Sequence, residues 1–187
     1  IDGRQIGPDQ PPYIIAEISA NHNGNIETAL KLIRIAKEAG ASAVKIQTYR
    51  PDTITIDHDS ELFRVKGGLW DGRTLYDLYC EAFTPWEWHQ TLFAEARKLG
   101  ITLFSSPFDN TAVDLLEDLD TPAYKIASFE AVDLPLIKYI ASKGKPIQLI
   151  AAFADHSQNN YDVQDSIDGD FKTGWAINVT GGKLNTN

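Results

Sequence analysis

The sequence predicts an α/β chain of the (β/α)8 TIM-barrel type, with about four βα units and a fifth strand. Two observations support this prediction. Short apolar runs alternate with segments of helical periodicity between Tyr13 and Leu149, as expected for parallel strands joined by right-handed crossovers. Polar residues also stand at or near the carboxyl ends of four successive runs, where barrel enzymes carry their chemistry.

An open, doubly wound sheet is the competing architecture. A dinucleotide-binding sheet of that kind would place a G-x-G-x-x-G turn after its first strand. Residues 20–25 read ANHNGN instead, so the sequence favours the barrel.

The apolar runs predict the positions of the strands, and the segments between them predict the helices. Strands are expected at Tyr13–Ser19, Ala43–Tyr49, Ile101–Ser105, Ala123–Ala127 and Pro146–Leu149. The segment after the first run presents apolar residues at three- and four-residue spacing, which is typical of a helix with one buried face; they are Ile26, Leu30, Ile33 and Ala36.

Capping residues mark the helix boundaries. Residues Thr84–Glu87 read TPWE, a capping box with proline in the first turn. Gly100 follows the expected end of that helix. Asp109 and Asp133 are expected to cap the third and fourth helices, and Gly144 to end the fourth.

The connection between Tyr49 and Thr84 is much longer than the others. Loops of this length inside compact domains are usually functional or disordered. Because this one contains Trp70 and several tyrosines, we expect an ordered lid over a site. The alternative is a surface excursion with a small hydrophobic cluster of its own.

Charge and composition argue against several classes of partner. The net charge of −9 argues against nucleic acid, whose phosphates attract basic surfaces, but allows a local basic pocket. No apolar run approaches the ~20 residues that cross a bilayer, and no signal-peptide pattern opens the chain. We therefore expect a cytoplasmic location and no membrane partner. Since the chain lacks methionine and begins at Ile1, we expect that it is not a complete translated product.

Two lysines lie inside expected strands, Lys45 in AVKIQTY and Lys125 in AYKIAS. Lysine is unusual there because parallel strands are covered on both faces. Three interpretations are open: a structural ion pair with Glu17 or another carboxylate, a Schiff-base nucleophile, or two ammonium groups that hold a phosphate or carboxylate. Hydroxyls at Ser106 and Ser128 favour the third.

Glu17 interrupts the first apolar run, and a carboxylate in a buried strand is costly unless its charge is compensated. His22, in the loop that follows, could suggest a metal ligand. No second histidine lies near it in sequence, so a hydrogen-bonded loop anchor is the better interpretation. His58, His89 and His156 show no ligand spacing.

Six segments, taken in order, resemble the sialic acid synthase family. They are AEISANHNGN, AVKIQTYRPDT, KGGLWDGRTLYDLY, TPWEWH, FSSPFD and PAYKIASFE. The resemblance covers about Ile6 to Leu149, and KGGLWDG is most similar to the pseudaminic acid synthase branch. It implies a (β/α)8 barrel that condenses phosphoenolpyruvate with an N-acetylated amino sugar to make a nonulosonic acid.

The resemblance also implies residue roles. Glu17 matches the acidic residue near the reacting carbons, which orients or protonates groups. Positions that bind the phosphate and carboxylate of phosphoenolpyruvate are matched by Lys45, Ser106, Lys125 and Ser128. Pocket-lining positions are matched by Gln47 and Phe108. The lid residues that fall where the amino sugar is recognised are Tyr49, Trp70, Asp71 and Tyr76.

In the family reaction, C3 of phosphoenolpyruvate attacks the open-chain aldehyde of the sugar. A divalent metal, manganese or magnesium, polarises that aldehyde as a Lewis acid. Water then adds at C2, and phosphate leaves through C–O cleavage. Family members are homodimers.

The sequence departs from the family at the fifth strand. Family members continue with Leu-Ser-Thr-Gly, whose serine also contacts phosphoenolpyruvate, whereas Ile150 stands in that position here. The metal-binding histidines of the family do not follow, so we expect no metal ligands in this chain and an inactive isolated chain. A non-catalytic carbohydrate-binding or scaffold fragment and a Schiff-base aldolase are the alternatives.

Two regions are therefore expected: a partial barrel at residues 1–150 and a divergent, β-like tail at residues 151–187. Within the tail, SIDGDFKTGWAIN resembles a short piece of the discoidin-like β-sandwich modules. Asp168 and Asp170 could suggest calcium, but two aspartates in a turn are more readily interpreted as solvated.

Overall fold

The computed structural model describes residues 1–7, 9–149, 175–178 and 183–186. Its main sheet has five parallel strands in the order β1-β2-β3-β4-β5. Each strand pairs with its neighbours in the chain, as in the wall of a (β/α)8 barrel. The strands are β1 (Ile15–Glu17), β2 (Ala43–Thr48), β3 (Thr102–Pro107), β4 (Tyr124–Ile126) and β5 (Ile147–Leu149).

All five predicted strands are therefore present. The strands β1 and β4 are shorter than their apolar runs, and β3 continues to Pro107. Four longer helices connect or follow the strands: α1 (Ile26–Glu38), α4 (Trp86–Leu99), α5 (Asn110–Asp118) and α6 (Leu134–Ser142). Shorter helices are α2 (Pro51–Ile54), α3 (Leu75–Ala82) and the 3-10 turns η1 (Glu61–Phe63), η2 (Gly68–Trp70) and η3 (Phe129–Val132).

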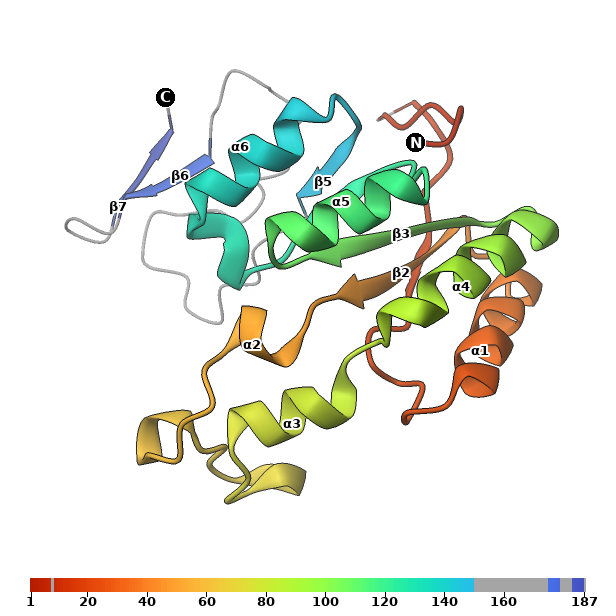
Figure 1. Ribbon diagram of the computed structural model, residues 1–187. Helices are drawn as coiled ribbons and strands as arrows, with labels where there is room; N and C mark the ends of the chain where they lie inside the picture. The colour runs from red at the N-terminus through yellow and green to blue at the C-terminus, as the bar shows by residue number, and fades with distance from the viewer. Residues whose placement is uncertain (8, 150–174, 179–182, 187) are drawn as a thin grey trace.

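The four longer helices pack against one face of the sheet, called the outer face here. In Figure 1, α4 and α5 lie in front of β2 and β3. Buried residues of all four helices belong to a single hydrophobic core, to which alternate strand residues contribute, among them Val44, Ile46, Leu103, Tyr124 and Ile126. A doubly wound sheet would carry helices on both faces, so the described helices follow the barrel arrangement.

The opposite, inner face carries the intervening strand residues, because side chains alternate along a strand. Toward the amino ends of the strands it holds a second hydrophobic cluster, formed by Ala43, Phe104 and Ala123 with Ile1, Tyr13 and Ile15 packed against them. Toward the carboxyl ends it becomes polar, with Lys45, Gln47, Ser106 and Lys125. The inner face thus has an apolar floor below a polar mouth.

Capping residues define two helix starts as predicted. Asp109 accepts hydrogen bonds from the first turn of α5, and Asp133 does the same for α6. The predicted capping box of α4 is wrong. Pro85 occupies the N-cap, so the helix begins one residue later than the box requires, and the Thr84 hydroxyl lies 3.2 Å from His22 Nε2 instead.

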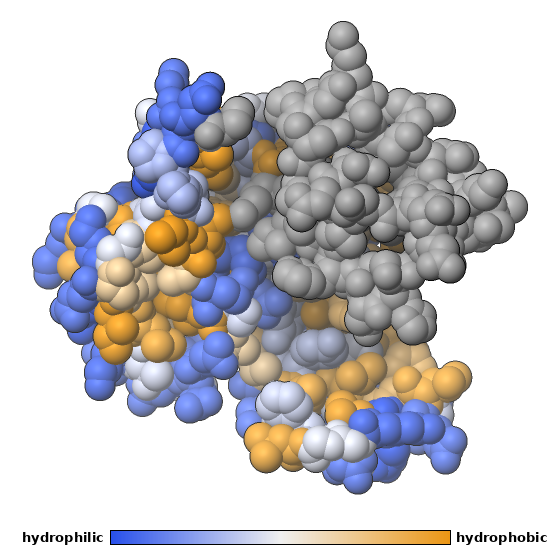
Figure 2. All heavy atoms as spheres, turned by 180° about the vertical axis from the view of Figure 1, so that it is seen from behind, coloured by the Kyte–Doolittle hydropathy of each residue, from blue (hydrophilic) through white to orange (hydrophobic). Residues whose placement is uncertain are grey.

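The long connection is a lobe of short helices at residues 50–83, which projects at the bottom of Figure 1. Its base packs on the strand ends through a shared hydrophobic cluster that includes Tyr79 and Phe83. Figure 2 shows hydrophobic side chains at the surface of this lobe, and the exposed ones are Ile56, Leu62, Leu69 and Trp70. That the lobe is a lid over the site stays a prediction.

Beyond the main sheet, β6 (Trp175–Asn178) and β7 (Lys183–Thr186) form an antiparallel pair. Ile150, Asp168, Asp170 and most of the tail lie outside the described residues, so the division into a partial barrel and a discoidin-like tail stays a prediction. Across the described ranges, no helix combines the length and the hydrophobicity that a membrane span needs.

Leu116 of α5 tests the outer-face core, because its side chain is 0% exposed. We expect Leu116→Ala to lower the free energy of unfolding by about 2–5 kcal/mol, since it leaves a cavity between helix and sheet. Urea denaturation followed by circular dichroism measures this. Leu62→Ala, at an 87% exposed position, is the control and should change stability by no more than about 0.5 kcal/mol. Equal effects of the two changes would contradict the described core.

Candidate active site

Lys45 places a buried positive charge on the inner face of the sheet. Its side chain extends from the inner face of β2 and is only 1% exposed. The ammonium forms an ion pair with Glu17 on β1 and lies 3.4 Å from the Ser106 hydroxyl on β3. A buried ammonium needs such partners, because removing an unpaired charge from water is costly.

Glu17 is the accessible member of this pair. Its side chain is 44% exposed, so the expectation of a buried carboxylate was wrong: the buried charge is that of Lys45. The reason is position, since Glu17 is the last residue of β1, an edge strand of the described sheet. Its Oε1 accepts hydrogen bonds from the Ser19 N–H at 3.0 Å and from the Ser19 hydroxyl at 2.8 Å.

Lys125 brings a second ammonium to the polar mouth. The strand register places it beside Ser106 on the inner face. Burial lowers the pKa of Lys125 and the Lys45 ammonium lowers it further, while Glu17 and Glu130 act in the opposite direction. Two ammonium groups that repel each other at one edge make a favourable environment for an anion.

Hydroxyl and amide groups complete this edge. Ser106 is fully buried and pairs in register with the half-buried Gln47. Ser128 is exposed at the start of η3, and its hydroxyl makes no capping hydrogen bond. The structure therefore brings Lys45, Lys125 and Ser106 together on the inner face, and places Ser128 in the turn that follows β4.

Glu130 is a candidate that the sequence analysis missed. It lies in η3, and its Oε2 is buried with no hydrogen-bond partner among the described residues. Burial raises the pKa of this carboxyl, and the Lys125 ammonium partly offsets that rise. A buried, unsatisfied carboxylate beside a cationic site is a candidate functional group. The signal was available, because Glu130 follows β4 within the segment PAYKIASFE.

Tyr49 and Phe108 belong to a buried aromatic cluster at the strand ends. They are 2% and 7% exposed. The Tyr49 ring meets that of Phe108 edge-on at 5.4 Å, and meets Tyr79 of α3 edge-on at 5.6 Å. Burial raises the pKa of the Tyr49 phenol. These rings fasten α3 to the barrel, and the pocket-lining and amino-sugar roles assigned to them stay predictions.

The other three lid residues lie in the lobe itself. Trp70 is 48% exposed. Asp71 Oδ1 accepts a hydrogen bond from the Gly67 N–H at 2.6 Å, which closes the turn KGGLWDG. The Cys80 thiol beside Tyr76 raises the pKa of the Tyr76 phenol. Recognition of an amino sugar by these residues stays a prediction.

His22 is a loop anchor, as predicted. It is 1% exposed, and its Nδ1 accepts a hydrogen bond from the Gly24 N–H at 3.2 Å. Its Nε2 therefore carries the proton and donates to the Thr84 hydroxyl at 3.2 Å. The loop after β1 is thereby tied to Thr84, two residues before α4 begins.

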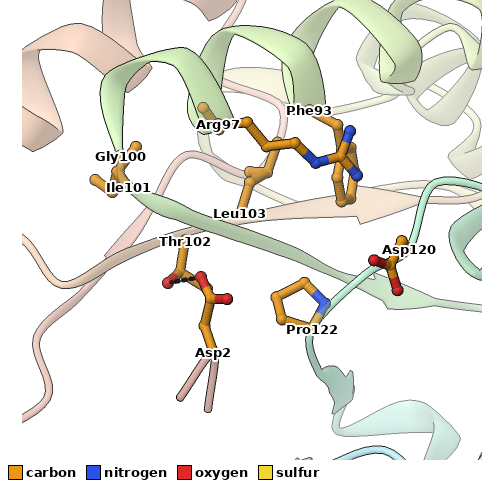
Figure 3. Close-up of a pocket in the computed structure, with 10 residues that line it drawn as sticks. Asp2, Phe93, Arg97, Gly100, Ile101, Thr102, Leu103, Asp120 and Pro122 are labelled. Atoms are coloured by element: carbon orange, nitrogen blue, oxygen red, sulfur yellow. Dashed lines mark hydrogen bonds between the residues drawn. The ribbon is translucent and has the colours of Figure 1, made fainter. Parts of the chain in front are cut away.

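A cavity of about 430 Å³ lies at the opposite end of the sheet. Figure 3 shows it at the start of β3, where Asp2 accepts a hydrogen bond from the Thr102 hydroxyl at 2.8 Å, with Arg97 of α4 nearby. None of the predicted site residues lines this cavity. The candidate site is therefore the polar mouth at the carboxyl ends of β1–β4.

The NeuB family profile matches residues 32–165, well over half of the chain. The chain belongs to the NeuB family. The resemblance inferred from the six sequence segments is thereby confirmed.

Curated relatives of this NeuB-family chain include pseudaminic acid synthases. The protein of Campylobacter jejuni is 54% identical over 138 residues, which are 74% of this chain and 40% of that protein. The protein of Helicobacter pylori is 49% identical over 158 residues, which are 84% of this chain and 45% of that protein. The chain thus spans less than half the length of these relatives.

A solved structure supports the fold of the NeuB-family chain. The crystal structure of N-acetylneuraminic acid synthetase from Leptospira borgpetersenii, in complex with citrate, superposes with a TM-score of 0.67 at 26% sequence identity. The match covers 79% of this chain and 47% of that one.

Glu130 provides a pH-dependent test of the site. Because burial raises the pKa of its carboxyl, the folded state binds a proton more readily than the unfolded state, and the ionised form destabilises the fold above that pKa. We expect Glu130→Gln to raise the free energy of unfolding at pH 7.5 by about 1 kcal/mol, and to raise it less at pH 5. Urea denaturation at both pH values measures this.

The matched control for Glu130→Gln is Glu61→Gln, at a position whose side chain is 90% exposed. It should change the stability little at either pH. A destabilising Glu130→Gln at pH 7.5, or a gain that grows as the pH falls, would contradict the assigned environment of Glu130.

Proposed function

We propose that this chain carries the phosphoenolpyruvate half of the active site of a synthase that joins phosphoenolpyruvate to an N-acetylated amino sugar. The observation that supports this most is the gathering of Lys45, Lys125 and Ser106 at the polar mouth of the inner face. The pseudaminic acid synthases among the relatives support the reaction class.

Phosphoenolpyruvate fits this mouth because it carries a phosphate and a carboxylate. The ammonium groups of Lys45 and Lys125 would neutralise part of its charge, and the Ser106 and Ser128 hydroxyls would donate hydrogen bonds. The apolar floor, which includes Phe104, borders the inner side of the site, and an apolar border strengthens electrostatic contacts of this kind. An anion would also relieve the repulsion between the two ammonium groups.

Glu17 is the proposed catalytic residue. It is open toward the mouth and fixed by Ser19 and Lys45, so it is placed to orient or protonate groups near the reacting carbons. In the proposed reaction, C3 of phosphoenolpyruvate forms a bond to the aldehyde carbon, whose oxygen takes up a proton. Water adds at C2, and phosphate leaves as the C2–O bond breaks.

The family reaction uses a divalent metal, manganese or magnesium, as the Lewis acid. Within the described ranges, no group of three or more His, Cys, Asp or Glu side chains could hold a metal ion. These residues do not fit a metal site, so we assign no step to one. A homodimer and the pseudaminic type of amino sugar are proposed on the family resemblance, and a cytoplasmic location on the sequence pattern described above.

A Schiff base on Lys125 is the second candidate. The lowered pKa of Lys125 favours it, because a larger fraction of the amine is then free to attack a carbonyl. Borohydride reduction in the presence of pyruvate would leave a covalent adduct on Lys125, detectable by mass spectrometry. An unmodified Lys125 would exclude this candidate.

Titration calorimetry with phosphoenolpyruvate tests the proposed site. We expect binding to the unmodified chain and a loss of at least about tenfold in affinity for Lys45→Ala, because this change removes a buried cation and leaves Glu17 facing the ligand. Lys98→Ala, at a 78% exposed position on the last turn of α4, is the control and should bind as the unmodified chain does. No heat with the unmodified chain, or equal affinity after Lys45→Ala, would refute the proposal.

A further inference from the structure

Three polar side chains lie fully buried on the outer face, where the neighbouring residues are apolar. They are Thr48 of β2, Ser105 of β3 and His89 of α4, each 0% exposed. The proposed reaction makes no use of them. Buried polar groups of this kind are costly unless each is hydrogen-bonded, so their partners need to be accounted for.

The three side chains form one hydrogen-bonded chain. His89 Nδ1 lies 3.1 Å from the Pro85 carbonyl oxygen, which can only accept, so Nδ1 carries the proton. Burial lowers the pKa of His89 and keeps the ring neutral. Nε2 is then the acceptor for the Thr48 hydroxyl at 2.8 Å.

The remaining link crosses between the two strands. The Thr48 and Ser105 hydroxyl oxygens are 2.6 Å apart. Because Thr48 donates its only proton to His89, the Ser105 hydroxyl donates to Thr48 in this arrangement. Ser105 Oγ also lies 3.2 Å from the Ile46 carbonyl of the neighbouring strand. This row of hydrogen bonds therefore connects α4, β2 and β3.

This hydrogen-bonded chain lies directly behind the candidate site. Successive residues of a strand point to opposite faces. The side chains of Thr48 and Ser105 therefore lie on the outer face, and those of their neighbours Gln47 and Ser106 lie on the inner face. The strand register pairs Gln47 with Ser106. The outer-face bond between Thr48 and Ser105 thus fixes the same strand ends that hold the site residues on the inner face.

Apolar side chains would hold helix and sheet together through non-directional contacts. Hydrogen bonds of 2.6 and 2.8 Å instead restrict the separation of the two strand ends. The start of α4 has two further contacts: Thr84, two residues before the helix begins, is bonded to His22, and the Arg50 guanidinium lies 3.8 Å from the centre of the Trp86 ring. These contacts help to hold the helix turn that carries His89 in place.

We propose that His89 is a positioning residue that holds the carboxyl ends of β2 and β3 through Thr48 and Ser105, and so sets the separation of Lys45 and Ser106 at the anion site. This inference rests on the proposed function for the identity of the ligand, phosphoenolpyruvate. The geometric part, fixing of the two strand ends by His89, stands on the hydrogen bonds alone.

Two substitutions at His89 separate positioning from packing. His89→Leu keeps a similar volume without an acceptor for Thr48, and we expect it to weaken phosphoenolpyruvate binding by at least about tenfold, because small displacements of binding groups are costly. His89→Gln keeps an acceptor and a donor, and should restore the affinity to within about threefold of the unmodified chain. Titration calorimetry measures both.

Thr48→Val removes the same link from the other side. It should weaken phosphoenolpyruvate binding about as much as His89→Leu does. The double variant should bind no more weakly than either single variant, since the two residues act through the same row of hydrogen bonds. Thr121→Val is the matched control, because this hydroxyl is also 0% exposed but bonds the Ala123 carbonyl at 3.0 Å, before β4 begins. It should lower the melting temperature and leave the affinity unchanged.

Hydrogen–deuterium exchange gives a readout that needs no ligand. In both His89→Leu and Thr48→Val, faster exchange should be confined to the carboxyl ends of β2 and β3, and Thr121→Val should leave these ends protected. Unchanged exchange there in both variants, or an equal increase over the whole chain, would overturn the proposal. So would unchanged phosphoenolpyruvate affinity in both variants of a chain that binds it. A chain that binds no phosphoenolpyruvate refutes the proposed function, and exchange alone then decides the role of His89.

Discussion

The buried ammonium of Lys45 is the interaction on which the site depends. A charge that is 1% exposed persists only where partners and geometry compensate its desolvation. Glu17 provides the opposite charge on one neighbouring strand and Ser106 a hydroxyl on the other. The pairing requires β1, β2 and β3 to stay in register, and the register in turn follows from the apolar residues that the same strands present to the helices. Packing on the outer face thereby fixes electrostatics on the inner face.

The first turn of α4 connects parts of the structure that are far apart in sequence. His22 reaches it from the loop after β1, Thr48 from the end of β2, and the lobe ends at Phe83, directly before Thr84. The side chains involved are mostly polar or aromatic, so their contacts are directional. These contacts hold the point at which the long insertion between β2 and β3 leads into α4. They also give buried histidines a structural reason to exist in a chain where neither has metal-ligand spacing.

The fold could be predicted from the sequence because its signals are local. Apolar runs, helical spacing and single capping residues such as Asp109 and Asp133 act within a few residues, and the structure confirms them. Lys45 and Lys125 were recognisable because lysine is unusual in a buried strand. The features that escaped prediction depend on contacts across long distances. Thr84 bonds His22 rather than its own helix, Glu17 is open because β1 is at the edge, and Glu130 is notable only once Lys125 lies beside it. His89 had no ligand spacing, and it reaches the sheet through Thr48 of β2, which in turn bonds Ser105 of β3.

Each strand of the sheet lies beside the one that immediately precedes it in the chain. Each strand of this sheet therefore pairs with the strands nearest to it in sequence, and the lobe is the long connection between β2 and β3. During synthesis, which proceeds from the amino end, β1 and β2 emerge before β3 and β4. Glu17 and Lys45 are therefore synthesised before Ser106 and Lys125. The residues of the cationic edge thus emerge in stages, and every new βα unit follows the strand beside which it pairs in the folded sheet.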